Sequence, residues 1–224
     1  SVLEQPAWPP RMRAWFQWGR HRWLLRQGRP DEALAHAWQQ VELIQASGSE
    51  RSSALTRGAN VAYCELAMGR ADVAEARARV ALSEVGPSDQ HAGHALDTWM
   101  MCLGVQGRFD EALATGQRAY ADLTASGDEF MMLDGLAMIA AEQGRLRDAA
   151  ITAARSDAEF AARGFRRWPL SVEWRRRTDV RLAAVPVAEL AHWKREAQQL
   201  SPTAAADLAL GRVRAASGAI SEAL

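Results

Sequence analysis

One stretch of the chain, GRFDEALATGQRAYADLTASGD from Gly107 to Asp128, decides the fold because closely similar stretches occur at least three more times. The others are GRPDEALAHAWQQVELIQASGS from Gly28, GRADVAEARARVALSEVG from Gly69 and GRLRDAAITAARSDAEFAARG from Gly144. The four leading glycines lie 41, 38 and 37 residues apart, a spacing typical of stacked helical repeats. The sequence therefore predicts a chain built from repeated units.

Small side chains recur at fixed places in each repeat. A small residue stands five and nine residues after each leading glycine, at Ala33, Ala37, Ala74, Ala78, Ala112, Gly116, Ala149 and Ala153. Because residues four apart share one face of a helix, these positions line one side of the helix that follows the glycine. We expect a neighbouring helix to approach closely along that side.

Each repeat is interpreted as two helices joined by a Gly-Arg turn. The glycine ends the first helix because glycine enters the left-handed conformation at low cost. A second glycine ends the second helix, at Gly48, Gly86, Gly127 and Gly164. The polar pairs Ser88-Asp89 and Asp128-Glu129 are expected to cap the next helix, and no alternation typical of strands occurs.

The glycine, the alanine five residues later and the large apolar residues before the turn resemble the tetratricopeptide repeat (TPR) along nearly the whole chain. These repeats are longer than that family's usual length of about 34 residues. The position four before the glycine is Leu24 or Leu103 in two repeats, but Glu65 or Ala140 in the others. Longer repeats with Gly-Arg turns resemble the helical superhelix on the C-terminal side of large bacterial ATP-dependent LuxR-type transcription regulators. The resemblance implies an all-α fold, a right-handed α-solenoid of antiparallel helix pairs.

The repeat continues in weaker form after the fourth copy. WPLSVEWRRRTDVRLAAV is expected to form the first helix of a degenerate fifth repeat, whose second helix opens at Pro186. Ser201 caps and starts a sixth repeat, in which Gly218 keeps the period. That repeat stops at Leu224, within its second helix. We therefore expect one TPR-like helical-repeat domain over residues 1–224, with five to six helix pairs, the last truncated, from a larger protein.

Composition describes a folded, soluble chain: 224 residues, 48% hydrophobic and 24% charged. No apolar run approaches the roughly 18 residues of a membrane span, and the first residues lack the apolar core of a signal peptide. We expect a cytoplasmic protein without a membrane partner. The formal net charge is zero, which argues against a dedicated nucleic-acid module, so no direct nucleic acid contact by this region is expected.

Catalytic motifs are absent from the sequence. It contains no P-loop, dinucleotide fingerprint, zinc-ligand spacing or nucleophile elbow, so we expect no enzyme, no cofactor and no metal site. His91, His94 and Asp97 come nearest to a ligand cluster, and they are interpreted as ordinary residues of an exposed helix start. Cys64 and Cys102 are interpreted as small apolar helix residues.

A basic cluster follows the fourth repeat. It consists of Arg166, Arg167, Arg175, Arg176, Arg177 and Arg181 and is accompanied by Trp168 and Trp174. These side chains suit phosphate contacts and base stacking, but the neutral chain favours a solvated helix face beside a core tryptophan.

The TPR resemblance places the concave surface at positions about thirteen, ten, six and two before each turn glycine. The candidate ligand- or partner-binding residues are Trp15, Trp18, Arg22, Arg26, Asn60, Tyr63, His94, Asp97, Met101, Met131, Asp134, Met138 and Glu142. Positions expected to face the second helix are Ala62, Met100 and Ala137. The alternative interpretation is that some of these residues only contact the next turn of the superhelix.

These observations favour a non-catalytic interaction and effector-sensing domain of a bacterial transcription regulator. The alternative is a free-standing TPR adaptor or assembly scaffold that binds a partner protein or peptide. Arg22 and Arg26 at one end, with Asp97, Asp134 and Glu142 farther along, predict a groove that is positive and then negative. We expect its occupant to be a protein, a peptide or a small effector with an apolar part and at least one charge.

Overall fold

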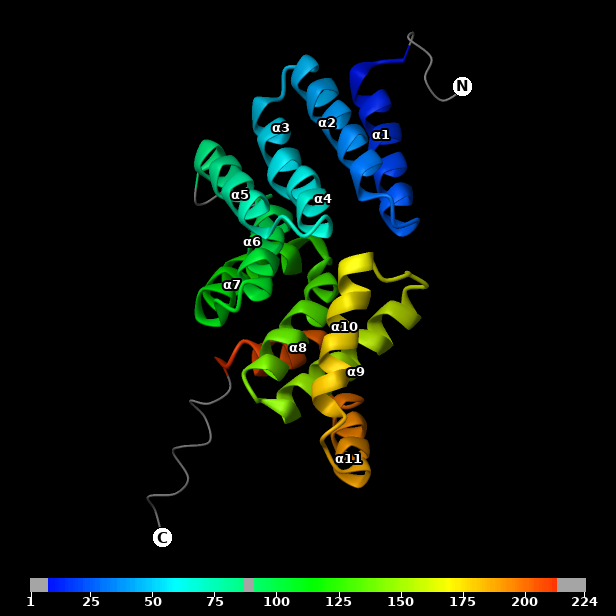
Figure 1. Ribbon diagram of the computed structural model, residues 1–224, viewed down its shortest axis with the longest axis vertical. Coiled ribbons are helices and arrows are strands. Elements are labelled where there is room, and N and C mark those ends of the chain that lie inside the picture. Colours follow the sequence, from blue (N-terminus) through cyan, green and yellow to red (C-terminus); the bar gives the residue numbers. More distant parts are fainter. Residues whose placement is uncertain (1–7, 87–90, 213–224) are drawn as a thin grey trace. The chain divides into compact units, whose positions relative to one another are not determined.

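The computed structural model of the chain describes residues 8–86 and 91–212 (Figure 1). Within these ranges every regular element is a helix and no strand occurs, which confirms the all-α prediction. The chain divides into two compact units, residues 1–123 (the N-terminal unit) and 124–224 (the C-terminal unit), and each is described by itself. That the repeats form a single domain stays a prediction.

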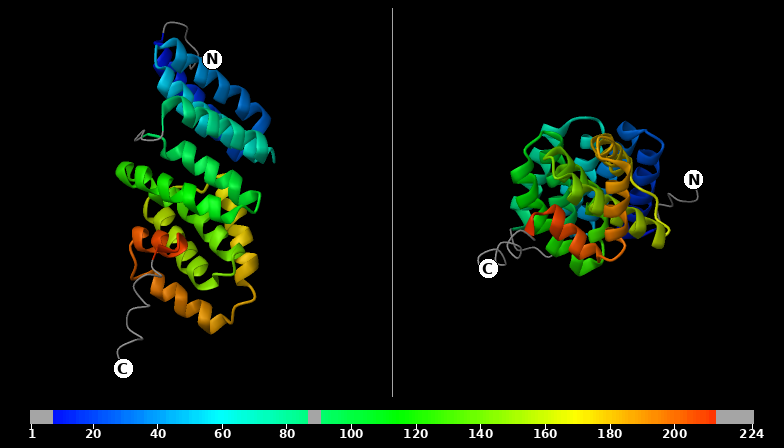
Figure 2. Two further views of the ribbon diagram at one scale, coloured as in Figure 1. Left: turned by 90° about the vertical axis from the view of Figure 1, so that its left-hand side faces the viewer. Right: turned by 90° about the horizontal axis from the view of Figure 1, so that it is seen from below.

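The N-terminal unit is a series of helices joined by short turns. Its elements are α1 (Pro10–Arg26), α2 (Pro30–Ala46), α3 (Glu50–Thr56), η2 (Arg57–Val61), α4 (Ala62–Ala67), α5 (Ala71–Val85), α6 (Gly93–Val105) and α7 (Phe109–Ser126), which crosses the unit boundary. Helix α1 packs against α2, α2 against α3 and α4, and α5 against α4, η2 and α6. Figure 2 shows α1 and α2 lying side by side as a hairpin.

The C-terminal unit repeats this hairpin arrangement. It contains η3 (Glu129–Met132), α8 (Leu133–Glu142), α9 (Leu146–Ala162), α10 (Pro169–Leu182), α11 (Val187–Ala197) and α12 (Pro202–Ala209). Helix α8 packs against α9 and α10, while α9 also contacts α11 and α12. Helices α10 and α11 lie where the degenerate fifth repeat was predicted.

The Gly-Arg turn has the same hydrogen bonds in all four repeats. Gly28, Gly69, Gly107 and Gly144 have φ between 68° and 77°, in the left-handed region. The amide of the following arginine donates to the carbonyl oxygen five residues before it, as in Arg108 to Leu103 at 2.9 Å and Arg145 to Ala140 at 2.9 Å. This six-to-one bond is the Schellman motif, which satisfies a carbonyl at the helix end. The turn prediction is confirmed, and the repeated glycine is explained by backbone conformation.

The repeated small residues are buried where helices meet. Ala33, Ala74, Ala112 and Ala149 are each 0% exposed, and the second small position in each repeat is buried as well. Ala62, Met100 and Ala137, expected to face the second helix, are also 0% exposed. The burial of these side chains agrees with the prediction that they face a neighbouring helix.

Two local features differ from the sequence expectation. Residues Arg57–Val61 form a π turn rather than continuous α-helix, and a Cβ on Gly58 would lie 2.8 Å from the Cβ of Ala81. The Asp128 side chain makes no capping hydrogen bond, and Glu129–Met132 is a 3₁₀ turn. Ser201 does cap its helix, accepting from the Ala204 amide at 3.1 Å.

Some predictions concern residues outside the described part of the chain: the Ser88-Asp89 cap and the end of the sixth repeat, with Gly218 and Leu224. Among the described helices, none combines the length and the apolar character needed to cross a bilayer.

Candidate functional site

Helix α1 presents a row of large apolar side chains to solvent. Trp15, Trp23 and Met12 are 69%, 54% and 49% exposed. Trp18 lies next to Trp15, with ring centroids 5.2 Å apart and planes at 69°. These four residues, here called the tryptophan face, lie on successive turns of α1 and together cover a broad part of its surface. An exposed cluster of this kind is typical of a recognition surface.

The charges of α1 are all positive. The helix contains Arg11, Arg13, Arg20, Arg22 and Arg26, and no aspartate or glutamate. The Arg22 guanidinium lies over the Trp18 ring, 4.3 Å from its centroid, so the cation stacks on the tryptophan face. The predicted positions Trp15, Trp18, Arg22 and Arg26 therefore share one helix that combines aromatic surface with positive charge.

The predicted residues of the second repeat lie against other helices of the N-terminal unit. Asn60, in the π turn, donates to Oε1 of Gln40 on α2 at 3.0 Å. The partly buried ring of Tyr63 packs against the core cluster around Leu25 and Val41. Each side chain is half-buried, so each offers only part of its surface to a ligand.

In the third repeat, the predicted residues differ in their exposure. His94 is exposed, whereas Met101 is buried at 7% exposure. The Asp97 carboxyl is buried at 6% exposure, and desolvation raises its pKa to about 7. The interpretation of Asp97 as a residue of an exposed helix start is wrong, because its side chain points into the protein. Its Oδ1 makes no hydrogen bond with any described residue.

The predicted acidic residues of the fourth repeat are engaged in ion pairs. Asp134 is 0% exposed and accepts from Arg167 Nε at 2.7 Å and from Ser156 Oγ at 2.7 Å. Glu142 accepts from Arg177 and Arg181, at 2.7 and 2.5 Å. Desolvation is the largest effect on Glu142 and raises its pKa, but the hydrogen bonds from both arginines outweigh it and the pKa is lowered. Neither carboxylate is a free ligand-binding group.

The predicted methionines of that repeat are mostly enclosed. Met138 is 1% exposed and Met131 is half-buried. The predicted groove runs through residues of both units, so it stays a prediction. The structure places the four α1 residues together in the N-terminal unit, and it places Asp134 and Glu142 in ion pairs within the C-terminal unit.

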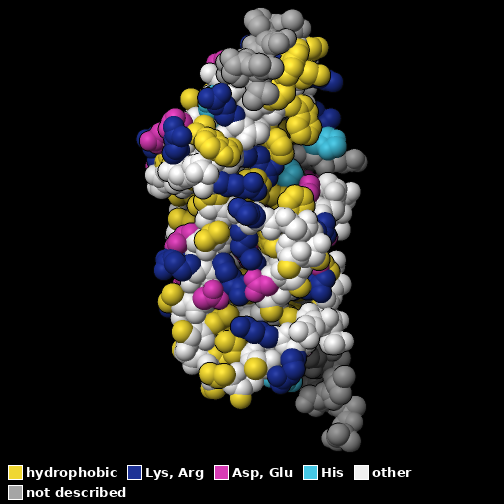
Figure 3. All heavy atoms as spheres, turned by 90° about the vertical axis from the view of Figure 1, so that its right-hand side faces the viewer, with side chains coloured by type: hydrophobic (Ala, Val, Ile, Leu, Met, Phe, Trp, Pro, Cys, Tyr) yellow, Lys and Arg dark blue, Asp and Glu magenta, His cyan; other side chains and the backbone are white. Residues whose placement is uncertain are grey.

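Most members of the basic cluster are neutralised by carboxylates. Arg175 contacts Asp157 and Asp179, and Arg176 contacts Glu173, at 2.6 to 3.0 Å. Trp174 is buried at 3% exposure, which agrees with the core-tryptophan interpretation. On the face drawn in Figure 3, basic side chains lie beside acidic ones, so the surface is of mixed charge.

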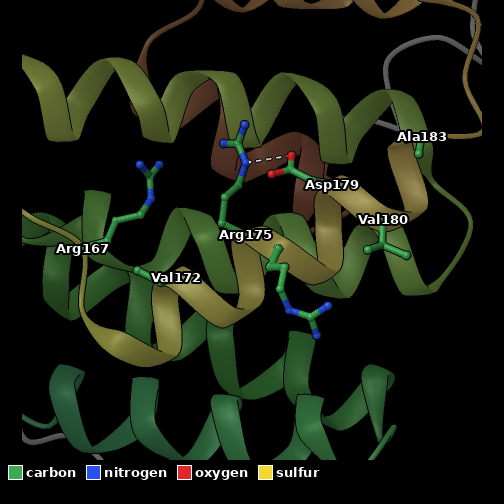
Figure 4. A pocket seen from close by; sticks show the side chains of 7 residues that line it. Arg167, Val172, Arg175, Asp179, Val180 and Ala183 are labelled. Atoms are coloured by element: carbon green, nitrogen blue, oxygen red, sulfur yellow. Dashed lines mark hydrogen bonds and ion pairs between the residues drawn. The ribbon is translucent and has the colours of Figure 1, made fainter. Parts of the chain in front are cut away.

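A shallow pocket of about 530 Å³ lies on α10 (Figure 4). It is lined by Arg167, Val172, Arg175, Arg176, Asp179, Val180 and Ala183, and we call it the α10 pocket. The sequence analysis placed three of these arginines in a basic cluster but did not predict a pocket. The sequence feature that could have indicated the pocket is the pair Val172 and Val180, two valines eight residues apart on a helix rich in arginine.

The described residues offer no arrangement suited to a metal ion, since no three His, Cys, Asp or Glu side chains come together for one. Cys64 and Cys102 are 0% exposed, and burial raises the pKa of both thiols to about 12. Both cysteines are therefore inert packing residues.

No protein-family model, curated protein or solved structure matches the chain.

Proposed function

We propose that the chain is a TPR-like interaction and effector-sensing region of a bacterial transcription regulator and that α1 docks a protein partner. The observation that carries the docking role is the tryptophan face, with Trp15 69% and Trp23 54% exposed on a helix whose only charges are arginines. Large aromatic side chains and arginine are the residue types most enriched where binding energy concentrates. The regulator assignment is supported by the repeat resemblance alone.

The repeated hairpins support a right-handed solenoid within each unit. The Schellman turns fix how each helix pair closes, and the buried alanines allow the pairs to stack closely. A solenoid displays its first helices along one surface, so in the proposed solenoid α1 would contribute to the surface that engages a partner.

Charge complementarity defines the partner. The five arginines of α1 favour a protein segment with acidic residues around an apolar centre, which would cover Trp15 and Trp23. A basic segment would be repelled by the positive charges of α1.

The decisive experiment isolates the full-length protein from the cells that produce it and compares the proteins that accompany it. The variant Trp15→Ala/Trp23→Ala removes exposed aromatic surface, while Val73→Ala/Val80→Ala removes exposed apolar surface on α5 as a matched control. We expect a partner retained by the control and lost by the tryptophan variant, with binding weakened roughly 30-fold or more. A partner held equally by both variants would overturn the proposal.

Charge is tested separately with Arg22→Glu. The substitution should weaken an acidic partner and flatten the salt dependence of its binding, because one of the screened attractions is removed. Binding that is unchanged at every salt concentration would show that Arg22 serves only to stack on Trp18.

A further inference from the structure

The α10 pocket combines an apolar floor with cationic groups, and we propose that it binds a small amphiphilic carboxylate, an anion with one carboxylate group and an apolar chain. The proposal rests on the proposed function only in treating this ligand as the sensed effector. Binding itself depends on the C-terminal unit alone. The pocket has a volume of about 530 Å³ and is broadly open to solvent, so a ligand would lie along its surface.

The floor of the pocket is apolar and open to solvent. Val172 and Val180 are 53% and 62% exposed, and Ala183 lies beyond them, directly after the last residue of α10. Eight residues of helix span about 12 Å, so the valines form a strip long enough for an alkyl chain. Covering this strip removes apolar surface from water, which favours binding of a chain over binding of a bare ion.

Two guanidinium groups above this strip already converge on one carboxylate. Oδ1 of Asp157, on α9, accepts from Arg167 Nη2 at 2.8 Å and from Arg175 Nη1 at 2.9 Å. Figure 4 shows Arg167 and Arg175 extending toward the same side of α10. The spacing of the two arginines therefore suits a carboxylate bridging between them.

Both arginines are held in place by buried or neighbouring acceptors. Arg167 donates to the fully buried Asp134 and stacks on Phe160, 4.7 Å from the ring centroid. Arg175 donates to the Ala153 carbonyl oxygen at 2.8 Å and to Asp179 at 3.0 Å. Preorganised donors lose little freedom on binding a ligand.

Each arginine retains donors for a ligand. Within the described part of the chain, Nη1 of Arg167 and Nη2 of Arg175 make no hydrogen bond. A ligand carboxylate can accept from these groups while Asp157 keeps its own bonds. Removing the Asp157 charge should then strengthen binding, because a competing carboxylate is lost.

The neighbouring carboxylates decide against a polyanion. Asp157, Asp179 and Glu173 stand among the arginines, so a nucleic acid backbone laid across α10 would meet negative as well as positive groups. A ligand with one carboxylate confines its negative charge to the unused donors of Arg167 and Arg175, and its uncharged tail is not repelled by Asp179.

The test measures octanoate binding to the full chain by calorimetry. Octanol lacks the charge, acetate lacks the chain, octylamine reverses the charge and inorganic phosphate offers a different anion. We expect octanoate to bind and the other four to bind at least about tenfold more weakly, since a charge-assisted hydrogen bond changes affinity by about ten- to a hundredfold. Octanol or phosphate binding as tightly as octanoate would overturn the proposal.

Three variants locate the site. Arg175→Gln should weaken octanoate about tenfold or more, while Asp157→Asn should tighten it. Arg181→Gln is the matched control, an arginine of the same helix that pairs with Glu142 outside the pocket. Equal loss with Arg175→Gln and Arg181→Gln, or weaker binding with Asp157→Asn, would contradict the site. If Arg175→Gln fails to fold, judged by circular dichroism, Asp157→Asn decides alone.

The variant Trp15→Ala/Trp23→Ala separates the two proposals. It should leave octanoate binding unchanged, because the pocket residues all belong to the C-terminal unit. If this variant loses the protein partner but still binds octanoate, the pocket proposal is supported independently of the docking proposal. If octanoate binding fails in the wild type while the partner is lost only in this variant, the docking proposal is supported without the pocket.

Discussion

The Arg77 guanidinium on α5 donates to both oxygens of the Glu65 carboxylate on α4, with Nε···Oε2 and Nη2···Oε1 distances of 2.7 and 2.6 Å. The Glu65 side chain is only 5% exposed, and Arg77 also lies over the Trp38 ring, 4.9 Å from its centroid. Glu65 stands where two other repeats have the buried leucines Leu24 and Leu103. An ion pair thus replaces an apolar contact at one repeat position.

Removing Arg77 should destabilise the protein strongly. Arg77→Met leaves a buried carboxylate without its cation, which costs about 3 kcal/mol of unfolding free energy, the lower end for a buried pair because the arginine side chain is 25% exposed. Urea unfolding measures the loss. The double variant Glu65→Leu/Arg77→Met should recover most of it, since leucine occupies this position elsewhere. A double variant no more stable than the single one would show that the charge is not the cause.

Enlarging the small-residue stripe should disturb helix packing. Ala112 is 0% exposed, so Ala112→Leu forces extra atoms into a close contact and costs about 1–3 kcal/mol. Ala114→Leu, at an exposed position of the same helix, is the control and should leave thermal unfolding unchanged. Equal melting temperatures for both variants would contradict the packing role of Ala112.

Buried His21 should make the protein less stable in acid. Desolvation, followed by the Arg22 and His36 charges, lowers the pKa of His21 to about 4. His21 is therefore protonated at a lower pH in the folded protein than in the unfolded chain, where its pKa is 6.5. Stability therefore falls as the pH drops from 6.5 to 4, by about 3 kcal/mol in all.

The His21 contribution is isolated by comparing urea unfolding of the wild type, His21→Gln and His192→Gln at pH 7 and pH 4.5. The slope between the two pH values should flatten only in the His21 variant, since His192 is exposed. The same slope in all three proteins would rule out His21 as its source.

Asp97 should act in the opposite direction. Its folded pKa of about 7 lies above the ordinary value of 3.8, so the stability linked to its protonated form is lost as the pH rises from 3.8 through 7. Asp97→Asn removes the buried charge and should raise the unfolding free energy at pH 8 by up to about 4 kcal/mol relative to the wild type, with little effect at pH 4. A variant less stable at pH 8 would mean that the ionised carboxylate has a stabilising contact.

The helix boundaries and small-residue contacts were predictable because they depend on local chemistry. The glycine of each Gly-Arg turn ends a helix because it adopts a positive φ. Small residues repeated every fourth position mark the face of a helix that packs closely against a neighbour. The site was harder to predict. Counting back from the turn glycine assumes an unbroken α-helix, and the π turn at Arg57–Val61 adds a residue to one turn, where Asn60 bonds to Gln40.

Long-range ion pairs also escaped the sequence analysis. Asp134 and Arg167 are 33 residues apart, and their bond depends on how α9, α10 and the connecting segment orient the guanidinium. The repeat period carries no information about the orientation of the Arg167 guanidinium. A carboxylate at a predicted groove position was therefore interpreted as available to a ligand, although a neighbouring arginine already binds it.

The arginine-only composition of α1 has a consequence for the speed of association. The chain as a whole is neutral, yet this helix concentrates five cations along about 26 Å. If α1 docks an acidic partner as proposed, this local concentration of positive charge would attract the partner before any side chain touches it. Encounters would then start in a productive orientation more often than random collisions do. Added salt would lower the association rate constant far more than it would raise the dissociation rate constant.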